Sequence, residues 1–306
     1  MARHFVTDLD LSAQEQAQVL ELALKMKANP DEYRTALSGK ILGMIFAKNS
    51  TRTRVSFEAG IIQLGGQGIF LPSSASQLGR GEPPADTGRV LSRYLDFIMI
   101  RTFDNREVRQ LAEASSVPVI NGLDDDYHPC QVLADLMTIK EKKGKLKGLQ
   151  LVYVGDGNNM AHSLMLGGAM AGMNVRIICP EGYRPKDGIL SSAQELGEKN
   201  DCEIEVTGDL GAVAGADIVY TDVWASMGQE EESAKRIKAF AGYQVDVAMM
   251  NKANVDAIFL HCLPAHRGEE VAAEVIDSPC SVVVQEASNR MHVQKGLLAW
   301  LLGANA

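Results

Sequence analysis

Two arginines stand at the predicted start of a helix, in the segment Ser50-Thr51-Arg52-Thr53-Arg54. Ser50 or Thr51 is a natural N-cap there, and the free N–H groups of a helix N-terminus already present positive charge. An acidic residue would be the stabilising choice. Arginine instead favours a bound anion, most simply a phosphate, held by guanidinium and backbone N–H groups together. Two solvated arginines that merely open a helix are the alternative.

Another arginine and a histidine lie at the ends of predicted elements. Arg101 ends the apolar run 97–100, and a charge at the carboxyl end of a buried strand faces the crevice where α/β proteins bind ligands. His128 precedes Pro129, which suits the first helical position, so the imidazole is placed at the cap with Gln131 on the same turn. The alternatives are an Arg101 that reaches solvent and a capping His128 without a catalytic role.

Polar loops follow two apolar runs in the second half of the chain. The loop 222–228 (DVWASMG) combines the carboxylate of Asp222, the hydroxyl of Ser226, the apolar Met227 and a flexible glycine. Such a set suits a zwitterion with an aliphatic stem, although a plain loop that caps the next helix is the alternative. Cys262 also follows an apolar run, so its thiol is either a group facing the crevice or a small hydrophobe.

The remaining chemical features are an arginine and a pair of glycines. Arg290 lies at the start of the predicted last helix, 288–302, where an arginine again fits an anion. Gly155 and Gly157 follow a predicted strand as in a dinucleotide-binding turn. The third glycine position is Met160, however, and no acidic residue is placed to hold a ribose. A tight turn therefore explains both glycines.

Alternating apolar runs and helical patterns predict the elements that position these residues. The fold class is α/β, with two doubly wound parallel-sheet domains joined by a long helix and a C-terminal helix that packs back on the first domain. The charged, glycine-broken segment 141–145 marks the boundary, which predicts domains at 1–143 and 144–285 and a C-terminal helix at 286–306. Strands are predicted at 41–46, 67–71, 97–100, 117–120, 151–154, 175–179, 203–206, 218–221, 257–260 and 281–284.

Composition excludes several classes of function. A net charge of −9 argues against nucleic acid as a partner, and no apolar stretch is long enough to cross a membrane. Five scattered cysteines and an N-terminus without an export signal predict a cytoplasmic protein with reduced thiols. His261 and His266 are close in sequence, but nothing completes a ligand set, so no metal is expected.

Four of these segments together resemble the aspartate/ornithine carbamoyltransferase family. Residues 50–54 resemble its carbamoyl phosphate motif, and 128–131 (HPCQ) resembles its HPxQ motif. Residues 222–228 and 261–264 (HCLP) resemble the DxWxSMG and HCLP motifs that mark the ornithine branch. The resemblance covers nearly the whole chain, in the family's order and spacing.

The resemblance implies transfer of a carbamoyl group from carbamoyl phosphate to the δ-amine of L-ornithine, giving L-citrulline and phosphate, with a role in arginine biosynthesis and no cofactor. The implied catalytic residues are Arg101, His128, Cys262 and Arg290. The implied carbamoyl phosphate-binding residues are Ser50, Thr51, Arg52, Thr53, Gln77, Arg101, His128, Gln131, Cys262, Leu263 and Arg290. The implied ornithine-binding residues are Asn159, Asp222, Ser226 and Met227.

The resemblance also implies a homotrimer or a multiple of trimers, in which the loop 76–82 carries Gln77 to the site of a neighbouring subunit. Three other functions stay open at this point. One is a carbamoyltransferase acting on a related amine such as putrescine, against which Asp222, Ser226 and Met227 argue. The others are a nucleotide-dependent dehydrogenase built on the Gly155 turn and a catalytically silent, anion-binding relative.

Overall fold

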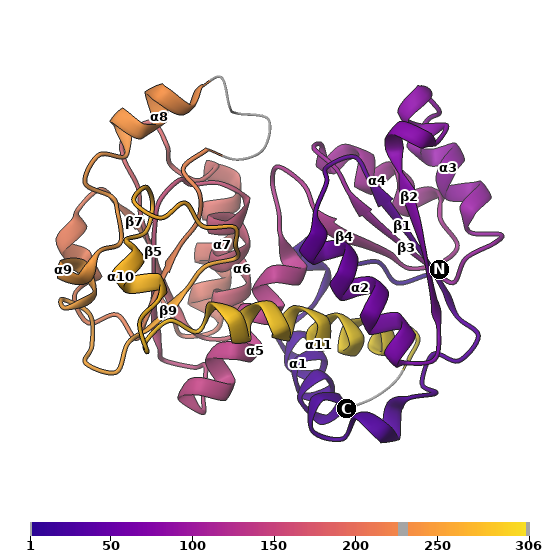
Figure 1. Ribbon diagram of the computed structural model, residues 1–306, viewed down its shortest axis with the longest axis horizontal. Coiled ribbons are helices and arrows are strands. Elements are labelled where there is room, and N and C mark those ends of the chain that lie inside the picture. Colours follow the sequence, from indigo (N-terminus) through magenta and orange to yellow (C-terminus); the bar gives the residue numbers. More distant parts are fainter. Residues whose placement is uncertain (1, 226–231, 304–306) are drawn as a thin grey trace. The chain divides into compact units, whose positions relative to one another are not determined.

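The computed structural model describes residues 2–225 and 232–303, and the chain forms two compact units (Figure 1). Met1–Met137 and Ser288–Ala306 make up the first unit, and Thr138–Ala287 makes up the second. The sequence places the boundaries after residues 143 and 285. In the structure they fall inside helices α5 (Pro129–Lys143) and α11 (Val283–Leu301), so each of these helices contributes residues to both units.

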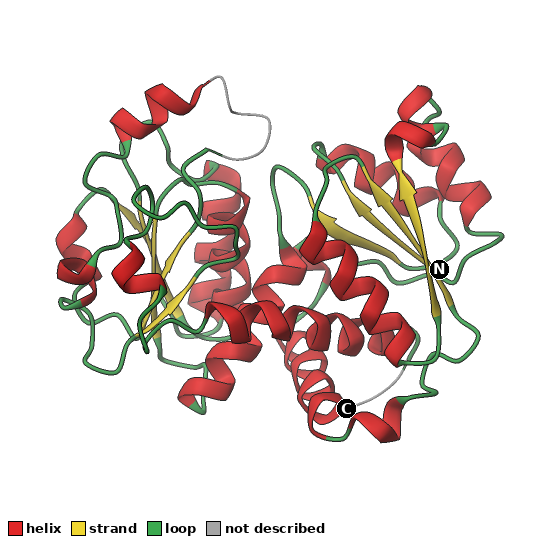
Figure 2. Cartoon of the chain, in the orientation of Figure 1, coloured by secondary structure: helices red, strands yellow, loops and turns green. Residues whose placement is uncertain are grey.

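The first unit is built on a four-stranded, wholly parallel sheet in the order β2-β1-β3-β4. Helices lie on both sides of it (Figure 2). Its strands are β1 (Ile41–Phe46), β2 (Gln67–Pro72), β3 (Phe97–Arg101) and β4 (Val119–Leu123), and its helices before α5 are α1 (Ala13–Ala28), α2 (Thr51–Gln63), α3 (Pro84–Leu91) and α4 (Asn105–Ala114). Short 3₁₀ turns are η1 (Asp8–Asp10), η2 (Pro30–Tyr33), η3 (Ser73–Ala75) and η4 (Leu78–Arg80).

The second unit is built on a five-stranded parallel sheet in the order β7-β6-β5-β8-β9. Its strands are β5 (Gln150–Val154), β6 (Asn174–Ile178), β7 (Ile204–Thr207), β8 (Ile218–Thr221) and β9 (Ile258–Leu260). Its other elements are α6 (Asn159–Met170), α7 (Asp187–Lys199), η5 (Leu210–Val213), α8 (Ser233–Ala239), α9 (Val247–Met250) and α10 (Ala273–Ile276). The predicted pair of doubly wound parallel sheets is confirmed.

The central strands are apolar throughout because helices cover both of their faces. Every residue from Phe97 to Ile100 in β3 has 0% exposure. Successive side chains of a strand point to opposite faces, and Ile98 and Ile100 join one core cluster with Val108 and Leu111 of α4. A parallel sheet buried on both sides needs such continuous hydrophobic runs. The sequence pattern is therefore a consequence of this layered packing.

The C-terminal helix packs against helices of the first unit, as predicted. A Cβ atom on Gly296 would lie 2.9 Å from the Cβ of Ala23 in α1, so only glycine allows the two helices to approach this closely. Lys27 donates a hydrogen bond to Asn289 at 2.7 Å across the same contact. The last part of α11 is thereby an integral layer of the first unit.

The order of the strands determines which loops can bind a ligand. In each sheet the first strands are added on one side of the starting strand and the later strands on its other side. The direction changes between β1 and β3 in the first sheet and between β5 and β8 in the second, and these are the switch points. Ligands of doubly wound folds bind outside the carboxyl ends of the strands at such points. The loops after these four strands carry most of the chemically interesting residues of the sequence.

One predicted strand is wrong. Residues 281–284 do not extend the second sheet, because Ser281 makes only an isolated bridge to Phe259 and α11 already begins at Val283. The β-branched run favours a strand locally, but strand propensity yields to tertiary packing. Among the residues that the structure describes, no helix combines the length and apolarity required to span a membrane.

Candidate functional site

The sequence allowed either Ser50 or Thr51 as the N-cap of helix α2, and the structure selects Ser50. Ser50 is the N-cap, and its Oγ accepts a hydrogen bond from the Thr53 backbone N–H at 3.1 Å. Arg52 is half-buried, whereas Arg54 is exposed, lies 3.9 Å from the centre of the Phe70 ring and pairs with a glutamate of the next turn. Only one of the two arginines is therefore a candidate to hold an anion at this helix end.

Two buried guanidinium groups converge on the hydroxyl of Thr53. Its Oγ1 accepts a hydrogen bond from Arg290 Nη2 at 2.7 Å and another from Arg101 Nη1 at 3.4 Å. The exposed fractions are 0% for Thr53, 8% for Arg101 and 3% for Arg290. Two guanidinium groups this close together provide several charge-assisted donors, which suits them to a multiply charged anion.

Arg290 reaches this cluster for a different reason from the predicted one. Because α11 begins at Val283, Arg290 lies well inside the helix and not at its N-terminus, and the helix-dipole argument for it is wrong. Tertiary packing of α11 brings its side chain to Thr53.

His128 is buried next to these cations. Burial lowers its pKa well below the ordinary value, and the charges of Arg290, Arg101 and Lys48 lower it further. The imidazole is therefore neutral at pH 7 and can donate one N–H hydrogen bond without carrying a charge. Gln131, on the first turn of α5, donates a hydrogen bond to the buried Asp135 carboxylate at 2.8 Å.

Lys48 is a residue that the sequence analysis missed. It is 4% exposed, forms an ion pair with Asp125 and lies 4.3 Å from the centre of the Phe103 ring. It follows β1 closely at the switch point, which is the signal that could have identified it. Gln77, in contrast, is exposed at the N-cap of η4.

The second unit gathers a carboxylate, an amide and a thiol at the ends of β5, β8 and β9. The Cys262 thiol donates to Asp222 Oδ1 at 3.1 Å, and Asn158 Nδ2 donates to Asp222 Oδ2 at 3.0 Å. Asn158 also caps α6, of which the half-buried Asn159 is the first residue. Asn158 is thus a second residue to which the sequence analysis assigned no role, since its role depends on the neighbouring strand.

The predicted ornithine-binding residues Ser226 and Met227 lie outside the described residues. The segment that precedes them is anchored by a buried ion pair. Arg236 Nη1 lies 2.6 Å from Asp156 Oδ2 and donates to the Trp224 carbonyl at 2.9 Å. This pair connects α8 to the turn after β5.

The loop containing Cys262 has its backbone fixed by His261. Nδ1 of His261 accepts from the Leu263 N–H at 2.9 Å, and Nε2 lies 3.0 Å from Glu270 Oε1, which makes Nε2 the protonated nitrogen. Leu263 has a φ of 57°, a left-handed conformation that a non-glycine residue rarely adopts. Ligand atoms of Asp222, His261 and Cys262 lie within 4.8 Å of one another, but both ring nitrogens of this histidine are already engaged.

Packing accounts for the second glycine of the turn after β5. A Cβ atom on Gly157 would lie 2.3 Å from the Pro185 backbone nitrogen, and the Gly157 N–H donates to the Tyr183 carbonyl at 2.8 Å. The close approach of this segment requires glycine whether or not a nucleotide binds. The turn therefore gives the dehydrogenase hypothesis no support.

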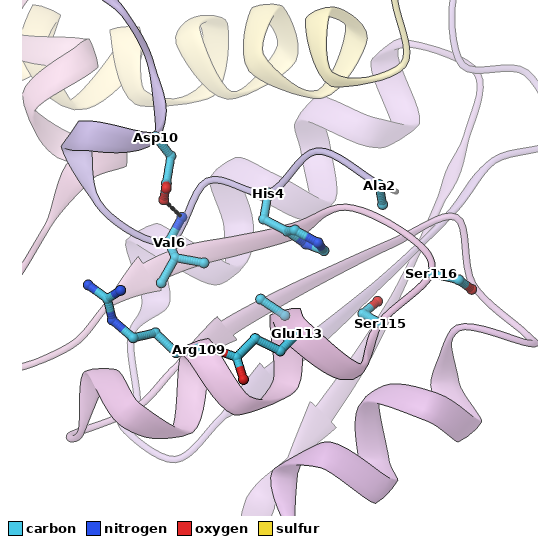
Figure 3. A pocket seen from close by; sticks show the side chains of 9 residues that line it. Ala2, His4, Val6, Asp10, Arg109, Glu113, Ser115 and Ser116 are labelled. Carbon is cyan, nitrogen blue, oxygen red and sulfur yellow. Dashed lines mark hydrogen bonds between the residues drawn. The ribbon is translucent and has the colours of Figure 1, made fainter.

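A separate groove of about 890 Å³ lies between the N-terminal segment and α4 (Figure 3). Its polar groups already hold the N-terminal segment in place. Asp10 accepts from the backbone N–H groups of Val6 and Thr7 at 2.7 and 2.8 Å, and His4 Nδ1 accepts from the Val119 N–H at 3.2 Å. None of the predicted site residues lines this groove.

The fold and the two constellations define an α/β enzyme with a buried cationic site on one unit and a carboxylate–thiol site on the other. Residues 3–141 match the family model of the carbamoyl-P binding domain of aspartate/ornithine carbamoyltransferase, and residues 147–301 match that of its Asp/Orn binding domain. The chain belongs to the aspartate/ornithine carbamoyltransferase family.

Named relatives are similar over nearly their whole length. An ornithine carbamoyltransferase of Symbiobacterium thermophilum is 57% identical over 98% of this chain and 98% of its own. One of Oceanobacillus iheyensis is 56% identical over 98% of this chain and 94% of its own. The solved structure of ornithine carbamoyltransferase from Pyrococcus furiosus is 49% identical, with a TM-score of 0.95 over 99% of this chain and 98% of that one.

Proposed function

We propose that this protein transfers the carbamoyl group of carbamoyl phosphate to the δ-amine of L-ornithine, forming L-citrulline and phosphate. The observation that carries the proposal is the convergence of Arg101 and Arg290 on Thr53 beside a neutral His128. Family membership and the names of the relatives support ornithine, and they do not favour putrescine.

In this proposal the N-terminus of α2 and Arg101 hold the phosphate of carbamoyl phosphate. Ser50, Thr51, Arg52 and Thr53 offer hydroxyl, guanidinium and backbone N–H donors at a helix end whose dipole already favours an anion. Helix N-termini and arginines both suit phosphate groups, the first through backbone N–H donors and the dipole and the second through the planar guanidinium.

The carbonyl oxygen of the carbamoyl group gains negative charge when the amine attacks. Thr53, Arg101 and His128 donate to that oxygen, Gln131 lies near the amide nitrogen, and Arg290 assists at the carbamoyl group. A neutral His128 keeps its ring N–H for donation at pH 7. Preorganised donors of this kind each contribute about 3 kcal/mol to comparable transition states.

Ornithine is held by Asp222, Asn159, Ser226 and Met227, with Cys262 and Leu263 at the reacting end. Asp222 and Cys262 share a hydrogen bond of 3.1 Å, so they are close enough to orient the reacting amine and the α-amino group of one ornithine. The attacking amine must be neutral, although the reference pKa of such an amine is about 10.4. The new C–N bond forms as the bond from carbon to the phosphate oxygen breaks, and the departing phosphate accepts the amine proton.

The assay that tests the proposal measures carbamoylated product from carbamoyl phosphate with ornithine, putrescine and aspartate offered separately. Turnover with ornithine alone is expected. Turnover only with putrescine or aspartate would keep the carbamoyl transfer and refute the amine assignment. Phosphate binding without turnover would favour the silent relative.

The proposed assembly is a homotrimer, or a multiple of trimers, in which Gln77 of one subunit serves the carbamoyl phosphate of the next. The exposure of Gln77 in its own chain is compatible with this role. Mixing inactive Gln77→Ala and Arg101→Ala chains should then restore activity to about a quarter of the sites by random assembly. No recovery in mixed trimers of verified composition would place Gln77 in its own subunit's site or in neither.

The proposed location is the cytoplasm, because none of the five cysteines is in a disulfide.

A further inference from the structure

The short loop between β4 and α5 is closed by the side chain of Asp124, which has 0% exposure. One carboxylate oxygen accepts hydrogen bonds from the backbone N–H groups of Asp126 and Tyr127, both at 2.8 Å. The Asp124 N–H in turn donates to the Tyr127 carbonyl at 3.0 Å. The backbone of this loop is therefore tied to a single side chain.

The other carboxylate oxygen fixes the loop to the rest of the first unit. It accepts from Asn105 Nδ2 of α4 at 2.6 Å and from Asn121 Nδ2 of β4 at 2.8 Å. Asn121 also donates to the Val6 carbonyl at 2.8 Å. Asp124 thus accepts hydrogen bonds from four N–H donors on a helix, a strand and its own loop.

His128 directly follows Tyr127, whose backbone N–H is one of those held by Asp124. The His128 carbonyl accepts from the Gln131 and Val132 N–H groups at 3.0 and 3.3 Å, so α5 begins directly from this residue. The loop backbone sets where the imidazole lies, while Asp125 of the same loop pairs with Lys48. A displacement of about 1 Å in a catalytic group can cost about 100-fold in rate.

We propose that Asp124 is a positioning residue for carbamoyl transfer, and that it acts by fixing the loop that presents His128. This inference rests on the proposed function. Only a carboxylate presents enough acceptor sites for four donors, since an amide would turn an NH₂ group towards N–H groups. Burial raises the pKa of Asp124 to about 6, and the hydrogen bonds from Asn105, Asp126, Tyr127 and Asn121 oppose this effect. The group is therefore mainly ionised, and acceptor-only, at pH 7.

The test replaces Asp124 by Asn and measures the steady-state kinetics of carbamoyl transfer. The control is Asp126→Asn, which changes a side chain of the same loop but keeps the Asp126 backbone N–H that donates to Asp124. Asp124→Asn is expected to lower kcat by about tenfold or more with the KM for ornithine nearly unchanged, and Asp126→Asn to leave kcat unchanged. In a His128→Gln background the effect of Asp124→Asn should vanish, because residues that act through one another are not additive. An unchanged kcat, or an equal loss in that background, would overturn the inference.

A second variant and a second measurement keep the test decisive if Asp124→Asn does not fold. Asp124→Ser keeps an acceptor for the two backbone N–H groups but loses the oxygen that Asn105 and Asn121 share, so it should lower kcat as well. The ring C–H signal of His128 in ¹³C-histidine NMR spectra, assigned with His128→Gln, should move in the Asp124 variants and stay in place in Asp126→Asn. An unmoved signal refutes the inference even if the wild-type protein transfers no carbamoyl group, which would refute the proposed function separately.

Discussion

Replacing Arg52 by Ala should remove binding of carbamoyl phosphate while the fold remains intact. Arg52 is the second residue of α2 and is half-buried. Within the part of the chain that the structure describes, its side chain makes no hydrogen bond or ion pair with another residue. Surface changes away from such contacts alter the free energy of unfolding by about 0.5 kcal/mol or less.

The expected loss of affinity follows from the hydrogen bonds that an arginine makes to a phosphate. A guanidinium group binds it through two charge-assisted hydrogen bonds, each contributing about 1.5–3 kcal/mol. At the lower end of this range the loss is about 3 kcal/mol, which corresponds to about 100-fold in Kd. Arg101 and Arg290 remain in place, so residual weak binding is compatible with the reasoning.

Arg54→Ala is the matched control, because Arg54 lies on the same helix but is engaged with the Phe70 ring and Glu58. Isothermal titration with carbamoyl phosphate gives Kd, and thermal unfolding confirms that both variants are folded. Arg54→Ala should change Kd by less than about threefold, the scale of an exposed ion pair. A near-normal Kd in Arg52→Ala, or an equal loss in both variants, would refute the argument from the helix terminus.

Three further predictions concern thiols and a histidine. Cys262→Ser should lower kcat by about tenfold or more with little change in the Kd of carbamoyl phosphate, and an unchanged kcat would remove the thiol from the reaction. Because the pKa of His128 is lowered by folding, the stability that its neutral form contributes is complete above about pH 6.5 and is lost as pH falls below that value, at up to about 1.4 kcal/mol per pH unit. Urea unfolding of His128→Gln between pH 5 and 8 should therefore show a shallower pH dependence than the wild type, and parallel curves would contradict this sign. Burial raises the pKa of Cys130 to about 12, so iodoacetamide at pH 8 should leave it unmodified in the native protein, as mass spectrometry of its peptide can establish, whereas rapid labelling would show that the thiol is accessible.

Local sequence patterns predicted the helices and strands because apolar residues occur at the positions where side chains are buried. Strands β1 and β8 have the predicted bounds, since a short apolar run between polar segments leaves little choice of ends. The same reasoning failed at 281–284. The local pattern there is compatible with both a strand and a helix, and only the packing of α11 decides between them. The local sequence also indicated a cap at Ser50 or Thr51, but it did not show which of the two residues takes that position.

The chemistry of the candidate site was readable one segment at a time. Arg101 at a strand end, His128 before Pro129 and Cys262 after an apolar run were each ambiguous alone, and the family resemblance gave them a shared meaning. Lys48 and Asn158 each follow a predicted strand closely, but they were not assigned because the partners that define their roles are distant in the sequence. Their contacts, with Asp125 and with Asp222, come from elsewhere in the chain.

By itself, the sequence determined the α/β class, the position of most elements and the residue types that could bind an anion and an amine. The tertiary structure alone decided the order of the strands within each unit, and with it the switch point at which that unit gathers its own residues. It also brought Arg290 to Thr53 across 237 positions of the chain. The physical reason is that periodicity encodes which face of an element is buried, whereas the partner that buries it is selected by the packing of the whole unit.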